Sequence, residues 1–148
     1  MRKIIMVVLC AACLLSGKKA WAGPLKIVTS QAFYADLVRK VGGDRVDVDS
    51  VASPKFNIHF IEPKPSDGRR TAKADLFVHT GLDLELWVDP LLEAAGNPEL
   101  FRGAKRNLDL SGRIRLLKLP VGPLSRAQGD VHLFGNPHYT MNPENAVI

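Results

Sequence analysis

The chain is 148 residues long and carries a formal net charge of +5, from 20 basic and 15 acidic residues. This length is enough for one domain with a substantial core and too short for two. No basic stripe with interleaved aromatic residues runs along the sequence, so we expect no nucleic-acid partner.

The first 22 residues have the features of a secretory signal peptide. A basic start precedes an apolar run over residues 4–15, and Ala20-Trp21-Ala22 is a small-residue cleavage site. A membrane-anchored N-terminus is the alternative, although a span needs about 20 apolar residues. Cleavage removes four basic residues and both cysteines, which leaves residues 23–148 with a net charge of +1 and no thiolate ligand. We therefore expect a periplasmic or otherwise extracytoplasmic protein.

The remaining chain begins with a β-α-β pattern. The β-branched run over residues 25–29 predicts a strand, and Ser30 is placed to cap the helix that follows. Gly42-Gly43 ends this helix. Residues 45–51 alternate between apolar and charged, which is typical of a second strand near the edge of a sheet. The helix has an apolar residue at every fourth position on one face: Phe33, Leu37 and Val41.

A proline-rich loop over residues 52–65 comes next. Ser66 is a candidate cap for a short helix that continues to Lys73. The apolar run over residues 75–80 predicts a buried strand. Asp89-Pro90 combines an N-cap with the residue favoured at the first helical position, and Gly96 ends that helix.

The last third of the chain has weaker signals. Residues 115–119 (R-L-L-K-L) predict another strand, and residues 120–136 read as a loop. Pro143-Glu144-Asn145, with Asn142 as cap, predicts the first turn of a helix. Because strands alternate with helices throughout, we expect an α/β fold with a parallel sheet.

Two histidine-bearing loops follow predicted strands. His59 lies in the loop after the second strand, and His138 lies after the last one. Loops at the carboxyl ends of parallel strands share one edge of the sheet, which is where such folds bind ligands. Imidazole nitrogen is a good ligand for zinc. Either histidine alone is as well explained as a surface residue, but the pair favours a divalent-metal site.

The other candidate residues have weaker claims. His132 is a possible further ligand, and we favour a supporting or structural role for it. His79 ends an apolar strand and is expected to lie near the core. Glu62 is either a carboxylate of the site or part of a loop boundary, and Trp87 is expected to anchor packing.

Sequence motifs for catalysis are missing. The chain has no G-x-S-x-G, no G-x-x-x-x-G-K-[ST], no H-E-x-x-H and no glycine-rich phosphate loop after a strand. We therefore expect a binding protein rather than an enzyme. The alternative is a small secreted metallohydrolase that uses His59, His138 and a metal-bound water, with Glu62 as its carboxylate.

Four segments carry a family resemblance. They are I-V-T-S-Q-A-F-Y-A-D-L-V-R-K-V-G-G-D-R-V, H-F-I-E-P-K-P-S-D, A-D-L-F-V-H-T-G-L-D-L-E-L-W and G-N-P-H-Y-T-M-N-P-E-N-A. In this order and spacing, the chain resembles the N-terminal half of the solute-binding proteins of zinc and manganese ABC transporters, the cluster 9 or TroA-like family.

The resemblance implies one α/β lobe of a two-lobed receptor whose lobes are joined by a long helix. Family members capture zinc or manganese, sometimes iron, and deliver it to a membrane permease. The lobe matched here would supply His59 and His138, while the C-terminal lobe would supply the other two ligands. We expect residues 23–148 to form this N-terminal lobe and to act as a monomer.

The sequence also departs from the family pattern. Asn57-Ile58 stands where the family usually has Asp-Pro, and the chain ends at Ile148, where the linking helix should begin. An incomplete ligand set predicts weak and poorly selective metal binding. One-to-one binding of Zn²⁺ below micromolar, measured by isothermal titration, would contradict that prediction. A non-functional gene fragment is a further alternative.

Overall fold

The computed structural model describes residues 23–117, 119–120, 122 and 132–147. The predicted signal peptide and most of the loop over residues 120–136 therefore lie outside the described part of the chain. Within that part, the helices are all too short or too polar to cross a membrane.

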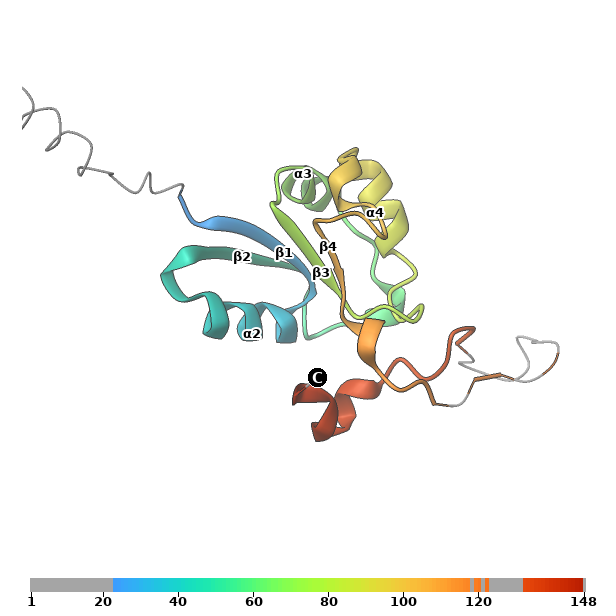
Figure 1. Cartoon of the computed structure of the whole chain (residues 1–148). Helices are drawn as coiled ribbons and strands as arrows, with labels where there is room; N and C mark the ends of the chain where they lie inside the picture. Colours follow the sequence, from blue (N-terminus) through green and yellow to red (C-terminus); the bar gives the residue numbers. More distant parts are fainter. Residues whose placement is uncertain (1–22, 118, 121, 123–131, 148) are drawn as a thin grey trace, which may run out of the picture.

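Four parallel strands form one sheet (Figure 1). Their order across the sheet is β2-β1-β3-β4. This arrangement confirms the predicted α/β class, and β2 lies at an edge of the sheet as its charged face indicated. The strands are β1 (Leu25–Gln31), β2 (Val46–Ala52), β3 (Leu76–His79) and β4 (Asn107–Asp109).

The sheet is covered on both faces, and the alternation of side chains along each strand builds two cores. Val28 and Phe77 face a cluster that contains Trp87 and the helix α4 (Val88–Ala95). Their neighbours Ile27 and Val78 face the opposite cluster, which includes a residue of α2 (Ala32–Gly42). Successive strand residues point to opposite faces, so both cores follow from the same short apolar runs.

Helix α2 has the predicted extent but faces the sheet with a different side. The buried residues are Tyr34 and Ala35, whereas Phe33, Leu37 and Val41 are all exposed. The four-residue apolar spacing that predicted the helix therefore marks a stripe that is exposed to solvent. The side with the small Ala35 packs onto the sheet because it allows a closer approach.

Several predicted helix starts are also corrected. Ser30 belongs to β1 and caps nothing; its hydroxyl donates to the Glu85 carboxylate at 2.7 Å. Helix α3 (Pro65–Ala72) has Lys64 as its N-cap, and the Asp67 carboxylate accepts the Lys64 backbone N–H at 2.7 Å. Ser66 therefore lies inside the helix, where a capping-box carboxylate makes a second cap unnecessary.

Helix α4 begins at Val88, so Asp89 lies in its first turn rather than at its cap. The predicted end is confirmed, because Gly96 adopts the left-handed conformation of a helix C-cap. At the end of the described chain, the Asn142 side chain accepts the Glu144 backbone N–H at 3.1 Å, as expected for a cap, and residues 143–147 form a 3₁₀ turn.

The last strand is not where the sequence placed it. Residues 115–117 and 119 are irregular, and β4 instead pairs with β3 at residues 107–109. Asn107 holds this short strand in place, because its amide donates to the Leu100 carbonyl at 2.8 Å and its amide oxygen lies 2.9 Å from the His79 ring. Because the contacts that hold β4 are polar, no run of apolar residues marks this strand in the sequence.

Candidate metal site

The two predicted histidines meet at the carboxyl edge of the sheet. His59 lies on the 3₁₀ turn η2 (Ile58–Phe60), which follows β2, and His138 immediately precedes η6 (Tyr139–Met141). Their ring centres are 5.8 Å apart, although the two residues are 79 positions apart in the sequence. The fold therefore brings together the pair that the sequence singled out.

His132 joins this pair. Its ring centre lies 5.3 Å from that of His59 and 5.9 Å from that of His138. The three imidazoles form a nearly equilateral cluster. We expected only a supporting role for His132, and the structure places it as close to each of the other two as they are to one another.

The same backbone turn presents His59 and His138. In each case an asparagine two residues earlier accepts the histidine N–H: Asn57 at 3.0 Å and Asn136 at 2.9 Å. Asparagine side chains favour this type of turn. The Asn57 amide oxygen therefore makes the hydrogen bond that an Asp carboxylate could also make at that position.

Asn136 also orients the ring of His138. Its amide oxygen lies 3.1 Å from Nδ1 of His138. Because that oxygen can only accept, Nδ1 carries the proton and the lone pair remains on Nε2. A histidine held in this way presents Nε2 to a metal ion.

Trp87 anchors the His59 loop. Its indole is only 6% exposed, and its N–H donates to the Ile58 carbonyl at 2.8 Å. Ile58 and Ile61 pack against the same core cluster. The expected packing role of Trp87 is confirmed, and the hydrogen bond adds a direct link from α4 to the residue before His59.

Tyr139 anchors the other loop. Its hydroxyl donates to the Thr80 carbonyl at 2.7 Å, and the Asn136 N–H donates to the Leu117 carbonyl at 2.8 Å. Gly135 has a φ of +105°, and a side chain there would also approach the Leu117 carbonyl to 3.0 Å. Burial raises the pKa of the Tyr139 phenol well above its ordinary value.

The turn after β3 has an unusual backbone. Gly81, Leu82 and Asp83 all have positive φ, at 81°, 53° and 59°. A β-carbon on Gly81 would overlap the Asp109 carboxylate, so only glycine fits. Leu82 is strained in this conformation, and such strain is concentrated at functional sites. Burial raises the pKa of the Asp83 carboxyl, while Arg102 and His132 act in the opposite direction.

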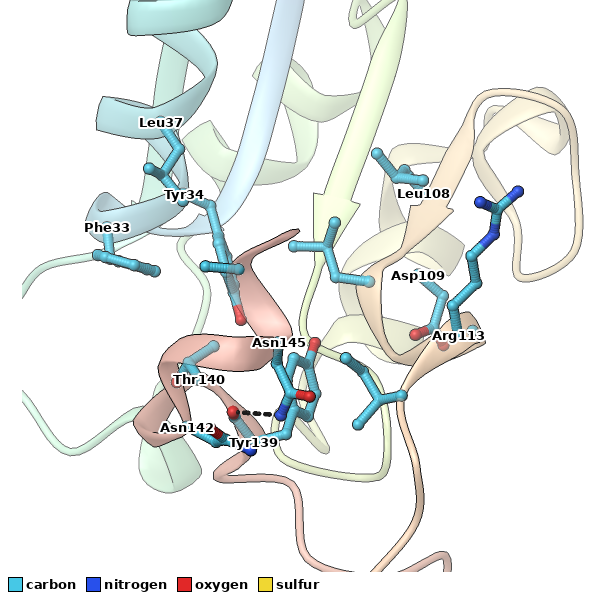
Figure 2. A pocket seen from close by; sticks show the side chains of 14 residues that line it. Phe33, Tyr34, Leu37, Leu108, Asp109, Arg113, Tyr139, Thr140, Asn142 and Asn145 are labelled. Atoms are coloured by element: carbon cyan, nitrogen blue, oxygen red, sulfur yellow. Dashed lines mark hydrogen bonds between the residues drawn. The ribbon is translucent and has the colours of Figure 1, made fainter. Parts of the chain in front are cut away.

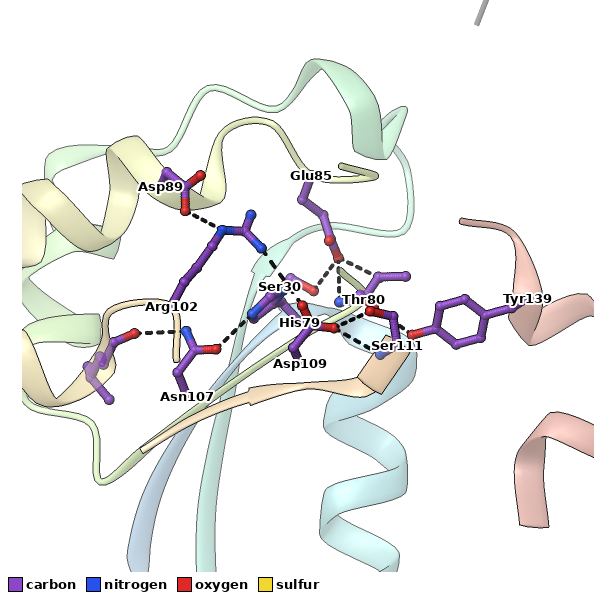
Figure 3. Close-up of polar contacts among 11 residues, drawn as sticks. Ser30, His79, Thr80, Glu85, Asp89, Arg102, Asn107, Asp109, Ser111 and Tyr139 are labelled. Carbon is purple, nitrogen blue, oxygen red and sulfur yellow. Dashed lines mark hydrogen bonds and ion pairs between the residues drawn. The ribbon is translucent and has the colours of Figure 1, made fainter. Parts of the chain in front are cut away.

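A buried carboxylate closes the base of this region (Figure 3). Glu85 is 1% exposed, and its Oε1 accepts the Ser30 hydroxyl at 2.7 Å and both the N–H and the hydroxyl of Thr80 at 3.1 and 2.6 Å. The network ties the ends of β1 and β3 together. We did not single out Glu85 from the sequence, where it is one of two acidic residues in the run L-D-L-E-L-W.

The other candidates lie elsewhere. His79 is buried as expected and contacts Asn107 through Nε2, while its Nδ1 has no hydrogen-bond partner among the described residues. Glu62 is exposed. Among the residues that the structure describes, no three His, Cys, Asp or Glu side chains are already arranged to hold a metal ion. The histidine rings would have to turn to share one.

A cavity of about 700 Å³ lies beside the C-terminal turns (Figure 2). It is bordered by Phe33, Tyr34 and Leu37 of α2 and by residues around Leu110 and Tyr139. None of the three clustered histidines lines it. This largely apolar cavity is therefore separate from the histidine cluster.

The chain thus has an α/β fold with a parallel sheet, and histidines from two loops lie together at the carboxyl edge of that sheet. A family model described as "Zinc-uptake complex component A periplasmic" matches residues 27–148. The chain belongs to this family.

Individual relatives have names of the same kind. The chain is similar to the manganese ABC transporter substrate-binding lipoprotein PsaA of Streptococcus mitis, with 30% identity over 98% of this chain and 44% of that protein. It is also similar to the iron-binding protein YfeA of Yersinia pestis, with 28% identity over 86% of this chain and 36% of that protein. Neither name is that of a hydrolase, so the metallohydrolase alternative has no support.

Solved structures show the same fold. A zinc-bound ZnuA deletion mutant matches with a TM-score of 0.63 and 25% identity, over 83% of this chain and 42% of its own. A manganese-bound periplasmic metal-binding protein from Candidatus Liberibacter asiaticus matches with a TM-score of 0.61 at 20% identity, over 82% and 40%. The chain thus spans less than half the length of these relatives and matches one part of them.

Proposed function

We propose that the protein captures a divalent transition metal outside the cytoplasm for an ABC importer, with His59 and His138 as ligands. The observation that carries this proposal is the 5.8 Å separation of the two rings at the carboxyl edge of the sheet. Membership of the zinc-uptake family supports it. Zinc, manganese and iron are the candidate ions, because the relatives are named for binding them.

The chemistry required is coordination and release, with no covalent step in the ion or the protein. Neutral imidazole nitrogens donate lone pairs, and the remaining positions around the ion are filled by water or by other oxygen and nitrogen donors. We propose residues 23–148 as one metal-binding lobe that acts as a monomer, and a membrane permease as the partner that receives the ion.

Isothermal titration of the purified protein with Zn²⁺ tests this function. We expect one-to-one binding, weak in keeping with a partial ligand set, and loss of the signal in His59→Ala and His138→Ala. Glu62→Gln is the matched control, because it changes an exposed carboxylate in the His59 loop and should bind as the parent does. Circular dichroism checks that each variant is folded. Unchanged binding in both histidine variants would overturn the proposal.

A further inference from the structure

The three ring separations set the geometry for a shared ion. Two imidazoles bound to one tetrahedral ion at about 2 Å have ring centres roughly 5 Å apart. The observed separations are 5.3, 5.8 and 5.9 Å. Each pair therefore needs to close by less than about 1 Å, which side-chain rotation alone can supply.

Ring orientation is the change that binding requires. The His59 and His132 rings are stacked, with 29° between their planes, so their nitrogens do not converge on one point as they stand. The His132 and His138 rings are nearly perpendicular at 72°. Turning one ring of the stacked pair would aim three nitrogens into the space between the rings.

The residues around His132 are suited to a histidine that coordinates a metal ion. Asp83, on the positive-φ turn after β3, lies close enough to His132 for that histidine to act on the pKa of the Asp83 carboxyl, in the lowering direction. A carboxylate beside a metal-binding histidine commonly accepts its second N–H and fixes the ring. His132 is half-buried and lies in the same loop as His138, so one loop can present both rings.

We infer that His132 is a third metal ligand and that this chain alone presents a three-imidazole site selective for zinc over manganese. The inference deepens the proposed function and rests on it. Three neutral nitrogen donors suit Zn²⁺, whereas Mn²⁺ prefers carboxylate, carbonyl and water oxygens. A metal site with three imidazole ligands therefore differs in its metal preference from a site that combines two histidines with carboxylates.

X-ray absorption at the zinc edge counts the ligands directly. The purified protein with one equivalent of Zn²⁺ should give scattering from three imidazoles, and His132→Gln should give two. Two imidazoles in the unmodified protein would overturn the inference without any variant being needed.

Affinity and selectivity give the second test. His132→Ala and His132→Gln should each lower the Zn²⁺ association constant at least tenfold, and His132→Asp should narrow the ratio of Zn²⁺ to Mn²⁺ affinity relative to the unmodified protein. If both neutral variants bind as the parent does while His59→Ala and His138→Ala lose binding, the third ligand is refuted and the proposed function stands. If all three histidines are dispensable, the proposed function itself fails.

Discussion

At the scale of single residues, two asparagines hold the turns that carry His59 and His138. Asn57 and Asn136 make the same turn, but only Asn136 also contacts a ring nitrogen. Their different contacts separate the effect of the turn from the effect of ring orientation.

Asn136→Ala should weaken Zn²⁺ binding more than Asn57→Ala does. Loss of a group that orients a metal-binding histidine typically costs 10- to 100-fold in affinity. Asn57→Ala removes one side-chain-to-backbone hydrogen bond, worth about 1 kcal/mol of stability. Isothermal titration of both variants measures the difference, and equal losses would show that the contact with Nδ1 of His138 is unimportant.

The two tyrosines predict an alkaline limit to stability. Burial raises the pKa of both Tyr34 and Tyr139, and the chain has no others. In the unfolded chain both phenols lose a proton near pH 10, whereas in the folded chain they stay protonated. Stability from this source is therefore complete below pH 10 and is lost as the pH rises further.

Absorbance at 295 nm, followed against pH, tests this expectation. Tyrosinate should appear together with loss of the circular dichroism signal and above pH 10. Ionisation of either tyrosine at pH 10 in the folded protein would contradict it. Tyr34→Phe should remove one of the two contributions, leaving the titration of Tyr139.

The sequence indicated His59 and His138 as candidate site residues, but it did not indicate Glu85. The proximity of His59 and His138 could be predicted from the turn-forming residues around them and from the strand before His59, although the chain expected to form a strand before His138 is irregular at residues 115–117 and 119. Glu85 could not be predicted, because its importance comes from Ser30, which lies 55 positions away. No local pattern records a hydrogen bond across that separation.

At the scale of secondary-structure elements, the hydrogen bonds of Glu85 join β1 and β3, two strands that are far apart in the sequence. β1 and β3 pair over only three residues, from Ile27 to Thr29 on the β1 side. The carboxylate at their ends extends that pairing through side chains. We expect the network to fix the position of the turn that carries Asp83.

Glu85→Ala should destabilise the protein by about 2–4 kcal/mol, because it leaves the buried donors of Ser30 and Thr80 without an acceptor. Glu85→Gln keeps one acceptor oxygen and should cost less, about 1 kcal/mol. Urea denaturation gives both values. A larger cost for the glutamine variant would mean that the negative charge, rather than the acceptor, is what matters.

Sequence patterns predict most of the strands and helices, but not β4. β1, β2, β3 and α4 were predictable from apolar runs and from glycine and proline signals. β4 was not, because its three residues include one exposed leucine and two polar side chains. The contact between Asn107 and His79 defines that strand, and it exists only after the fold has formed.

At the scale of the whole molecule, an exposed apolar stripe on α2 lies beside the cavity in Figure 2. Phe33 is 55% exposed, Leu37 44% and Val41 82%. Exposed apolar groups next to a cavity bind apolar dyes and promote association.

Leu37→Gln should therefore reduce the binding of the dye ANS and any self-association of the protein. Lys40→Gln, an exposed change on the same helix, is the matched control and should leave both unchanged. Fluorescence titration and sedimentation velocity measure the two effects. Equal dye binding by both variants would show that the stripe does not form the dye site.

The turn before His138 has a further consequence for the chemical lifetime of the protein. Asparagines deamidate when the backbone nitrogen of the next residue attacks the side-chain amide to close a succinimide ring. After Asn136 that nitrogen belongs to Pro137, which has no N–H to lose and is already substituted by its own ring. The Asn136 amide that orients His138 is thus protected from deamidation by Pro137, and the loop can keep its hydrogen bonds over the lifetime of the protein.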